Sequence, residues 1–303
     1  MKYLIQEETG RLDRFLTEKL SESRSQLQKL IINKRILLNG EIASPSSKIK
    51  AGDIIEVDLE TKAEKKINQQ VIQKAEVIKK ETDYLIVNKP AGLVVHNTAS
   101  MSEYTLVDWL LEEYPELQGI GEDEFRPGIV HRLDKEVSGL MVIARNQKSF
   151  NNLKQQFKDR TIIKKYQGLV YGEIKEESGR IDFPIARATA GHKMAARPSN
   201  AEGRESITEF TVLKHFVNYT FVEVIIKTGR THQIRAHFSA TNHPLVGDNL
   251  YGTKMTRIKN KKLELGRIFL VAVELGFTNL KGKAVKYKID LPKSLEELLK
   301  TVK

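Results

Sequence analysis

Two helical patterns and then a strand pattern occupy the first sixty residues. Apolar residues recur at helical spacing over 12–20 and again over 27–31, and Ser23–Gln26 has the form of a capping box before the second run. Asn39-Gly40 stands between apolar residues, as in a tight hairpin turn, and apolar and acidic residues alternate over 55–59, as on a half-buried strand. These patterns predict a small helix-helix-strand unit.

Strand patterns outnumber helical ones in the rest of the chain. The strand-like segments are 84–89, 140–145, 166–174, 207–213, 220–228 and 267–277. Helical patterns cover 105–115, 146–158 and 231–241, and no repeat with a period of 20 to 50 residues is evident. The pattern predicts an α+β fold with a large mixed sheet and a few flanking helices.

A change in composition separates the two regions. The stretch 60–80 is rich in Lys, Glu and Gln, and we expect its first half to be a linker and its second half a strand that enters the next domain. The predicted domains are therefore 10–60, a linker at 61–75, and a larger domain at 76–303.

Composition narrows the chemistry. None of the 303 residues is a cysteine, which excludes disulfides, thiolate nucleophiles and cysteine-ligated zinc. No run of about 18 apolar residues occurs, and the first ten residues carry acids where a signal peptide would be basic and then apolar. We expect a soluble, cytoplasmic protein with no membrane partner.

The chain is basic, with 50 Lys and Arg against 39 Asp and Glu, a net charge of +11. The positive charge is concentrated at 24–35, 145–165 and 257–267. Any one of these clusters could be an ordinary solvated face, but three on a net basic chain favour a nucleic-acid partner.

The stretch GIVHRLDKEVSG, residues 128–139, places a carboxylate among basic and apolar residues. A carboxylate in an apolar setting is costly unless a cation pairs with it, so Asp134 needs a partner. A second dense stretch, KTGRTHQIRAHF, predicts a strand, a turn at Arg230 and a helix capped by Thr231. Arg235, just inside that helix, is the candidate partner.

Other chemistries fit these residues less well. His232 and His237 are five apart and would point about 140° apart on a helix, so they could not clamp one metal ion. Ser138 lacks the G-x-S-x-G elbow of a serine hydrolase, and His131 is more simply a hydrogen-bonded structural histidine. A glycosidase that uses Asp134 with a second carboxylate would need the two groups about 5 to 10 Å apart across a sugar, whereas the neighbouring acid lies on the same loop.

GIVHRLDKEVSGLMVIARN resembles the HRLD-x-x-[ST]SG motif of the RluA family of pseudouridine synthases. The resemblance continues through YLIVNKPAGLVVH, KKYQGLVYGEI, KTGRTHQIRAHFSATNHPLVGDNLYG and RIFLVAVELGF. Residues 11–59 are similar to an S4 RNA-binding domain, with its small αL fold. The resemblance implies a pseudouridine synthase fold in which the large mixed sheet is mainly antiparallel.

The resemblance also implies a reaction and roles. Pseudouridine formation breaks the bond from uracil N1 to the sugar and rejoins the base through C5, with no cofactor and no metal. By motif position, Asp134 is the essential carboxylate, and Arg235 is the arginine paired to it. Arg132 enters the space left by the extruded base, and Tyr166 stacks on the uracil near C5.

Further residues are assigned to RNA binding. Arg230, His232 and Gln233 lie in the second motif, beside the predicted site. The S4-like unit is expected to present a basic helix surface to RNA. Its candidate contacts are Arg11, Arg24, Ser25 and Lys29.

Two residues depart from the family pattern. Val137 stands where threonine is usual, which removes a hydroxyl, but the similar shape predicts that activity survives. Val271 stands where a histidine is common and is expected to alter RNA contacts.

The predicted function is isomerisation of specific uridines in structured RNA, most simply in the 23S RNA of the large ribosomal subunit, by a monomeric enzyme. Two alternatives are a synthase that acts on transfer RNA and an inactive RNA-binding factor for ribosome assembly.

Overall fold

The computed structural model describes residues 2–6, 10–20, 27, 30–31, 35–44, 46–57, 74–97, 103–123, 125–188, 193–197 and 202–302. The chain divides into two compact units, one within residues 1–68 and one within 69–97 and 103–303. Among the described residues, no helix has the length and apolar character needed to cross a membrane. Residues 61–73, most of the predicted linker, lie outside the described part, so the linker stays a prediction.

In the described part of the N-terminal unit, helix α1 (Leu12–Lys19) packs on a small sheet. Helix α1 places Leu12 and Leu16 in a core with Ile36 and Ile55. The four-stranded sheet has the order β1 (Lys2–Leu4), β6 (Ile54–Val57), β3 (Ile36–Leu38) and β4 (Glu41–Ile42), and β2 (Gly10–Arg11) pairs separately with β5 (Lys48–Ile49). The unit therefore holds more strands than the predicted helix-helix-strand arrangement.

The hairpin and one helix of this unit match their sequence signals. Asn39 and Gly40 both adopt positive φ, 53° and 80°, and join β3 to β4, as predicted. Described residues of the second predicted helix, such as Leu27 and Ile31, are helical and buried. The capping box at 23–26 lies outside the described residues.

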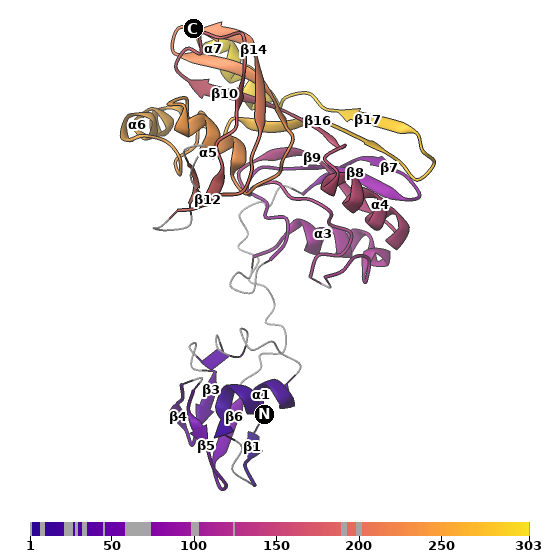
Figure 1. The fold of residues 1–303 in the computed structure, drawn as a ribbon, viewed down its shortest axis with the longest axis vertical. Helices are drawn as coiled ribbons and strands as arrows, with labels where there is room; N and C mark the ends of the chain where they lie inside the picture. The colour runs from indigo at the N-terminus through magenta and orange to yellow at the C-terminus, as the bar shows by residue number, and fades with distance from the viewer. Residues whose placement is uncertain are drawn as a thin grey trace. The chain divides into compact units, whose positions relative to one another are not determined.

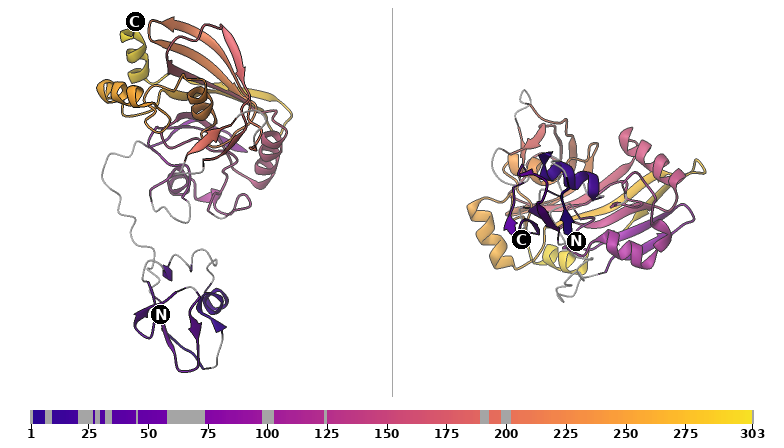
Figure 2. Two further views of the ribbon diagram at one scale, coloured as in Figure 1. Left: turned by 60° about the vertical axis from the view of Figure 1, so that its left-hand side comes forward. Right: turned by 90° about the horizontal axis from the view of Figure 1, so that it is seen from below.

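One nine-stranded sheet organises the C-terminal unit (Figure 1 and Figure 2). Its order is β11 (Ser178–Ile181), β14 (Thr208–Phe216), β15 (Tyr219–Ile226), β10 (Ile163–Tyr171), β16 (Leu270–Thr278), β9 (Ser138–Ala144), β8 (Tyr84–Lys89) and β7 (Glu76–Lys80), with β17 (Ala284–Lys288) also paired to β16. Every neighbouring pair is antiparallel except β9 with β16. The predicted α+β class and mainly antiparallel sheet are confirmed.

Helices cover both faces of the sheet. They are α3 (Leu106–Glu113), the short 3₁₀ helix η1 (Pro115–Leu117), α4 (Gln147–Lys158), α5 (Gln233–Ala240), α6 (Lys254–Leu263) and α7 (Lys293–Thr301), and a separate ribbon pairs β12 (Ile185–Arg187) with β13 (Met194–Ala196). On β8, Leu85 and Val87 join the cluster that includes α3, whereas Tyr84 and Ile86 join the cluster that includes α4. A strand buried on both faces explains why the segment 84–89 is almost continuously apolar.

The parallel contact of β9 with β16 positions the loop that carries Asp134. It pairs Ser138 with Val271 and Gly139 with Ala272. A Cβ on Gly139 would lie 2.4 Å from the Ala272 carbonyl oxygen, and the glycine has φ of +126°, so only glycine fits there. The glycine of the first motif is thus required where its loop enters the sheet.

The last predicted helix begins later than expected. His232, not Thr231, is the N-cap residue of α5, and it adopts a left-handed conformation with φ of 56°. The Gln233 side-chain oxygen accepts the backbone N–H of Arg230 at 3.1 Å, so a glutamine satisfies a donor at the turn that threonine was expected to cap. The prediction of a Thr231 cap was wrong for this reason.

Candidate active site

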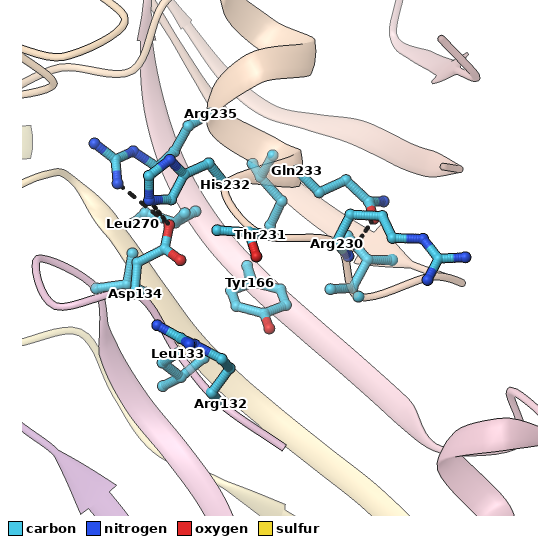
Figure 3. A pocket seen from close by; sticks show the side chains of 14 residues that line it. Arg132, Leu133, Asp134, Tyr166, Arg230, Thr231, His232, Gln233, Arg235 and Leu270 are labelled. Carbon is cyan, nitrogen blue, oxygen red and sulfur yellow. Dashed lines mark hydrogen bonds and ion pairs between the residues drawn. The ribbon is translucent and has the colours of Figure 1, made fainter. Parts of the chain in front are cut away.

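Asp134 lies in the loop before β9, at the edge of a cavity of about 80 Å³. Its side chain is 17% exposed, and Oδ2 accepts a hydrogen bond from Arg235 Nη1 at 3.3 Å (Figure 3). The predicted pairing of two groups 101 positions apart in the sequence is therefore present. A carboxylate at this depth has both a counter-ion and a face toward the cavity.

Arg235 is held from its other side by a carboxylate that the sequence reasoning did not single out. Its Nε and Nη2 donate to the two oxygens of Asp248 at 2.8 and 3.1 Å, and Asp248 is fully buried. Nη1 also lies 3.3 Å from Glu136. Burial alone would lower the pKa of Arg235, but the hydrogen bonds and charge of Asp248, and then the charge of Asp134, raise it above its ordinary value. Three carboxylates therefore keep this guanidinium charged and fixed.

His232 reaches the same carboxylate from the start of α5. Its Nε2 lies 3.9 Å from Asp134 Oδ2, and its Nδ1 lies 3.1 Å from the hydroxyl of Tyr251. Because the backbone N–H of Met194 donates to that hydroxyl oxygen at 2.8 Å, the phenol hydrogen can donate to Nδ1. The ring proton then sits on Nε2 and faces Asp134. Burial lowers the pKa of His232, and the negative charge of Asp134 acts in the opposite direction.

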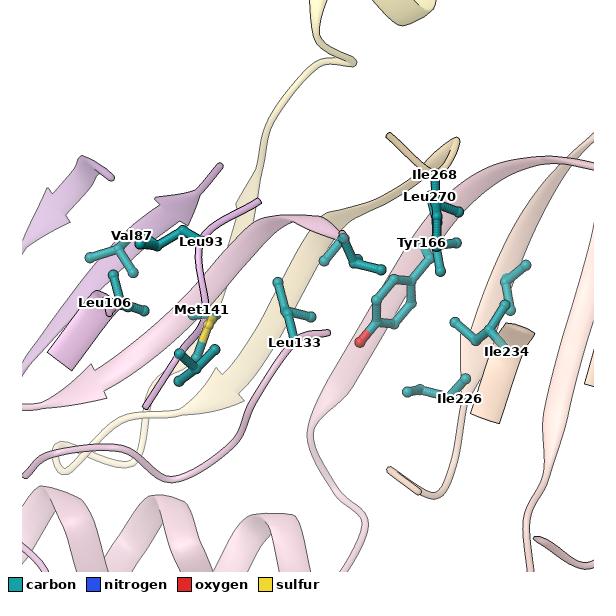
Figure 4. Packing of buried hydrophobic residues seen from close by; sticks show 14 of the residues in the cluster. Val87, Leu93, Leu106, Leu133, Met141, Tyr166, Ile226, Ile234, Ile268 and Leu270 are labelled. Atoms are coloured by element: carbon teal, nitrogen blue, oxygen red, sulfur yellow. The ribbon is translucent and has the colours of Figure 1, made fainter. Parts of the chain in front are cut away.

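Tyr166, on β10, forms a wall of the cavity (Figure 3). Its ring packs in the main core among Ile226, Ile234 and Leu270, and the residue is 7% exposed (Figure 4). Burial, and then the negative charge of Asp134, raises the pKa of the phenol above its ordinary value. A neutral phenol on an apolar support is suited to stacking against a flat ring rather than to serving as a strong base.

Arg132 and Arg230 line the cavity on either side of Tyr166 in the view of Figure 3. Arg132 is exposed, and no hydrogen bond or ion pair fixes its guanidinium among the residues that the structure describes. Arg230 is half-buried, and its Nε donates to the carbonyl oxygen of Glu205 at 3.2 Å. Arg132 is thus the freer of the two cations.

Gln233 lines the cavity, but its side-chain amide makes hydrogen bonds inside the protein. Its oxygen accepts from the Thr228 hydroxyl at 2.7 Å, and its nitrogen donates to the Ile207 carbonyl at 2.9 Å. The residue is 3% exposed. This geometry suits bracing of the turn at 228–232 better than the direct RNA contact that the sequence reasoning assigned to it.

A buried lysine supports the Asp134 loop. Lys89 is fully buried, and its Nζ donates to the carbonyl oxygens of Pro90, Leu93 and Lys135 at 2.8, 2.8 and 3.3 Å. Burial lowers its pKa to about 7, although the charges of Asp134 and Glu136 act in the opposite direction. The lysine ties the loop after β8 to the loop that holds Asp134. The sequence reasoning quoted it within NKPAG but gave it no role.

His131 is a structural histidine, as expected. Its Nε2 accepts the backbone N–H of Val142 at 3.0 Å, and its ring stacks on Phe157 with centroids 4.7 Å apart. Burial, and then the charge of Lys164, lowers its pKa to about 3. The neutral ring pins the segment that carries Arg132 against β9.

The two departures from the family pattern lie in different places. Val137 is 3% exposed and lines the cavity, and its backbone N–H donates to the Asp134 carbonyl at 3.2 Å, so the turn is held by backbone bonds. Val271 is fully buried in a cluster with Leu169 and Phe269. The Val271 side chain has no exposed surface for a direct RNA contact, and its effect on RNA contacts stays a prediction.

The S4-like residues are only partly placed. Arg11 is half exposed and donates Nε and Nη2 to the buried carboxylate of Asp13 at 3.0 and 2.9 Å. Arg24, Ser25 and Lys29 lie outside the described residues. Their assignment to RNA binding stays a prediction.

Among the described side chains, no group of three or more His, Cys, Asp or Glu residues is arranged to hold a metal ion.

Comparison with known proteins agrees with this arrangement. Residues 83–240 match the family described as RNA pseudouridylate synthase, and residues 10–55 match the S4 domain. An uncharacterized RNA pseudouridine synthase of Aquifex aeolicus is 38% identical over 98% of this chain and 95% of its own. A ribosomal large subunit pseudouridine synthase D of Zymomonas mobilis is 34% identical over 96% of this chain and 93% of its own.

A solved structure shares the fold. Human RNA pseudouridylate synthase domain containing 1 aligns with a TM-score of 0.58 and 26% identity, over 76% of this chain and 94% of that chain. The matched family and the shared fold define the class of this protein, an RNA-modifying enzyme. The chain belongs to the RNA pseudouridylate synthase family, with an S4 domain at its N-terminal side.

Proposed function

We propose that this enzyme converts uridine to pseudouridine in large-subunit ribosomal RNA in the cytoplasm, with Asp134 as the essential carboxylate and with no cofactor. The observation that carries the proposal is the Asp134 carboxylate, held 3.3 Å from Arg235 Nη1 at the mouth of a cavity walled by Tyr166. The choice of ribosomal RNA rests on relatives of this length that are named for the large subunit.

The reaction needs an ionised carboxylate beside the glycosidic bond. The bond from N1 to C1′ breaks, the base turns, a bond from C5 to C1′ forms, and the C5 proton leaves, so the product is an isomer of the substrate. Whether the carboxylate attacks the sugar, attacks the base or removes a sugar proton, it must be charged. In this proposal Arg235 pairs with the Asp134 carboxylate and fixes its direction.

The remaining roles follow from position. Tyr166 offers an apolar-backed ring on which uracil can stack, and Arg132, the unpaired cation, occupies the space that the base leaves in the RNA. His232 and Arg230 contact the extruded nucleotide from the turn before α5. Arg11, with Arg24, Ser25 and Lys29, supplies RNA affinity on the S4 unit, and the enzyme acts as a monomer.

Tritium release tests the proposal. Ribosomal RNA labelled at uracil C5 should lose tritium to water with the wild-type protein, and Asp134→Asn should slow release by roughly 10³-fold or more, because an amide can neither attack nor accept a proton. Asp159→Asn, an exposed aspartate at the end of α4, is the matched control and should react like wild type.

Each other outcome has a meaning. Release by Asp134→Asn at the wild-type rate would exclude the aspartate role, and release from neither protein would favour an RNA-binding assembly factor. Labelled transfer RNA as a parallel substrate would show whether ribosomal RNA is the right choice. Elution as a dimer in gel filtration would contradict the monomer.

A further inference from the structure

A second hollow, of about 380 Å³, opens beside the cavity and shares Arg132, Tyr166 and Arg230 with it. We call it the basic groove. Six cations line it, and no Asp or Glu does: Arg132, Lys158, Arg160, Lys164, Lys227 and Arg230. A groove lined by one sign of charge concentrates ions of the opposite sign, so its shape and charge fit a polyanion.

Lys164 is the inner lysine of the groove, less exposed than Lys158 and Lys227. Its side chain is half-buried, and burial lowers its pKa to about 8. Its Nζ lies 5.5 Å from the centroid of the Phe157 ring, and no carboxylate pairs with it within the described part of the chain. Taking an ammonium out of water without a counter-ion is costly, which indicates that the counter-ion comes from a ligand.

The next residue on the same strand provides a contrast. Lys165 is not part of the groove, and its Nζ lies 2.9 Å from Glu223. Two rim cations are also paired, Arg160 with Glu205 at 2.6 Å and Lys227 with Glu209 at 3.5 Å. Among the described residues, two exposed cations of the groove therefore have carboxylate partners, whereas the half-buried Lys164 has none.

We propose that the basic groove binds the phosphodiester of a nucleotide next to the target uridine, with Lys164 as its inner contact. The inference rests on the function proposed above and adds the path of the strand. A uridine between Asp134 and Tyr166 stays linked to its neighbours, and the groove begins at Tyr166, where that strand must leave the cavity. Phosphate contacts of this kind set register and affinity without reading bases.

Oligonucleotide substrates with one neutral methylphosphonate linkage at a time, on either side of the target, test the path. For the wild type, neutralising one flanking linkage should lower kcat/KM about 10-fold, in the range of a charged hydrogen bond. Lys164→Gln should show that loss on the unmodified RNA and no further loss with the modified linkage. Lys165→Gln, the matched control, should keep the wild-type sensitivity.

Salt dependence gives an independent readout. A contact to one phosphate of a single strand contributes about 0.7 to the slope of log affinity against log salt, so Lys164→Gln should reduce the slope by about that amount. Lys164→Arg should restore it. Thermal unfolding of Lys164→Gln should occur at or above the wild-type temperature, because a half-buried charge without a described counter-ion is removed.

The outcomes separate this inference from the function. If wild type is active and Lys164→Gln keeps both the full salt slope and the sensitivity to the modified linkage, the groove does not hold the strand. A reduced slope with no linkage coupled to Lys164 would also overturn the proposed path. Failure of the wild type to release tritium from any RNA would instead defeat the proposed function.

Discussion

Arg132 and Arg235 line the same cavity as Asp134 but have opposite surroundings. Arg235 is 3% exposed and contacts three carboxylates, whereas Arg132 is exposed and has no such partner in the described residues. A guanidinium saturated by the protein can fix another group but cannot bind a new anion. An unsaturated one costs little stability and is available to RNA. The contrast separates cations that build the site from cations that meet the substrate.

The largest expected effect is on folding, at the saturated cation. Arg235→Leu leaves the fully buried Asp248 without its cation and should lower the free energy of unfolding by about 3 to 5 kcal/mol. Arg132→Ala, the matched control, should stay within about 0.5 kcal/mol of wild type. Urea unfolding measures both, and an equal loss in the two variants would abolish the distinction.

The next effect is on activity, at the unsaturated cation. If Arg132 fills the space of the extruded base, Arg132→Ala should lower kcat/KM about 10- to 100-fold on a uridine stacked in a helix, in keeping with an unstacking cost of a few kcal/mol. On a target that is already unpaired the loss should be much smaller. Comparison of two synthetic RNAs with the same target checks this, and equal losses on both would contradict the role.

The free energy of unfolding should depend on pH through His131, because burial and the charge of Lys164 lower the pKa of this histidine to about 3. Below pH 6.5 the unfolded chain takes up a proton that the folded protein does not, so stability should fall with falling pH down to about 3, by at most about 1.4 kcal/mol per pH unit. His131→Gln keeps an acceptor for the Val142 N–H and should flatten that slope. Unfolding temperature measured against pH for the wild type and this variant checks the prediction, and equal slopes would contradict it.

The smallest effect is expected at Glu136. It shares Arg235 Nη1 with Asp134 at the same distance, 3.3 Å, but is 48% exposed. Exposed ion pairs contribute little, so Glu136→Gln should change the free energy of unfolding by less than about 1 kcal/mol. Thermal unfolding of this variant beside Arg235→Leu would show how much the contact of Glu136 with Arg235 contributes to stability. A loss of similar size in the two variants would mean that Glu136 is as essential as Asp248.

Sequence patterns predicted the strands well where burial is two-sided. The segments around β8, β9 and β16 are nearly continuous apolar runs, because helices cover both faces there. Helices α6 and α7 were missed, since each buries few apolar side chains, α7 only Leu295. In the N-terminal unit β1 was missed because a three-residue strand is too short for an alternation to register.

The site was predictable only as far as residue chemistry and motif position carry. The cost of a carboxylate in an apolar setting pointed to Asp134 and to Arg235 as its partner, whereas Tyr166 and the roles of all three residues came from the family resemblance. Asp248 went unassigned because its partner lies on a helix that the sequence pattern does not connect to it. Tyr251 was missed for the same reason, although GDNLYG contains both residues.

Only Leu133 separates Arg132 from Asp134, so at most about 7 Å of extended backbone joins the two Cα atoms. That short piece is clamped at one end by the His131 bond to Val142 and at the other by the close approach of Gly139 to Ala272. On the proposed roles, this short piece of backbone fixes both how far Arg132 enters the RNA and where Asp134 meets the sugar. An insertion between Arg132 and Asp134 would misplace both side chains at once. A change of RNA target is therefore expected to come from surfaces outside this loop.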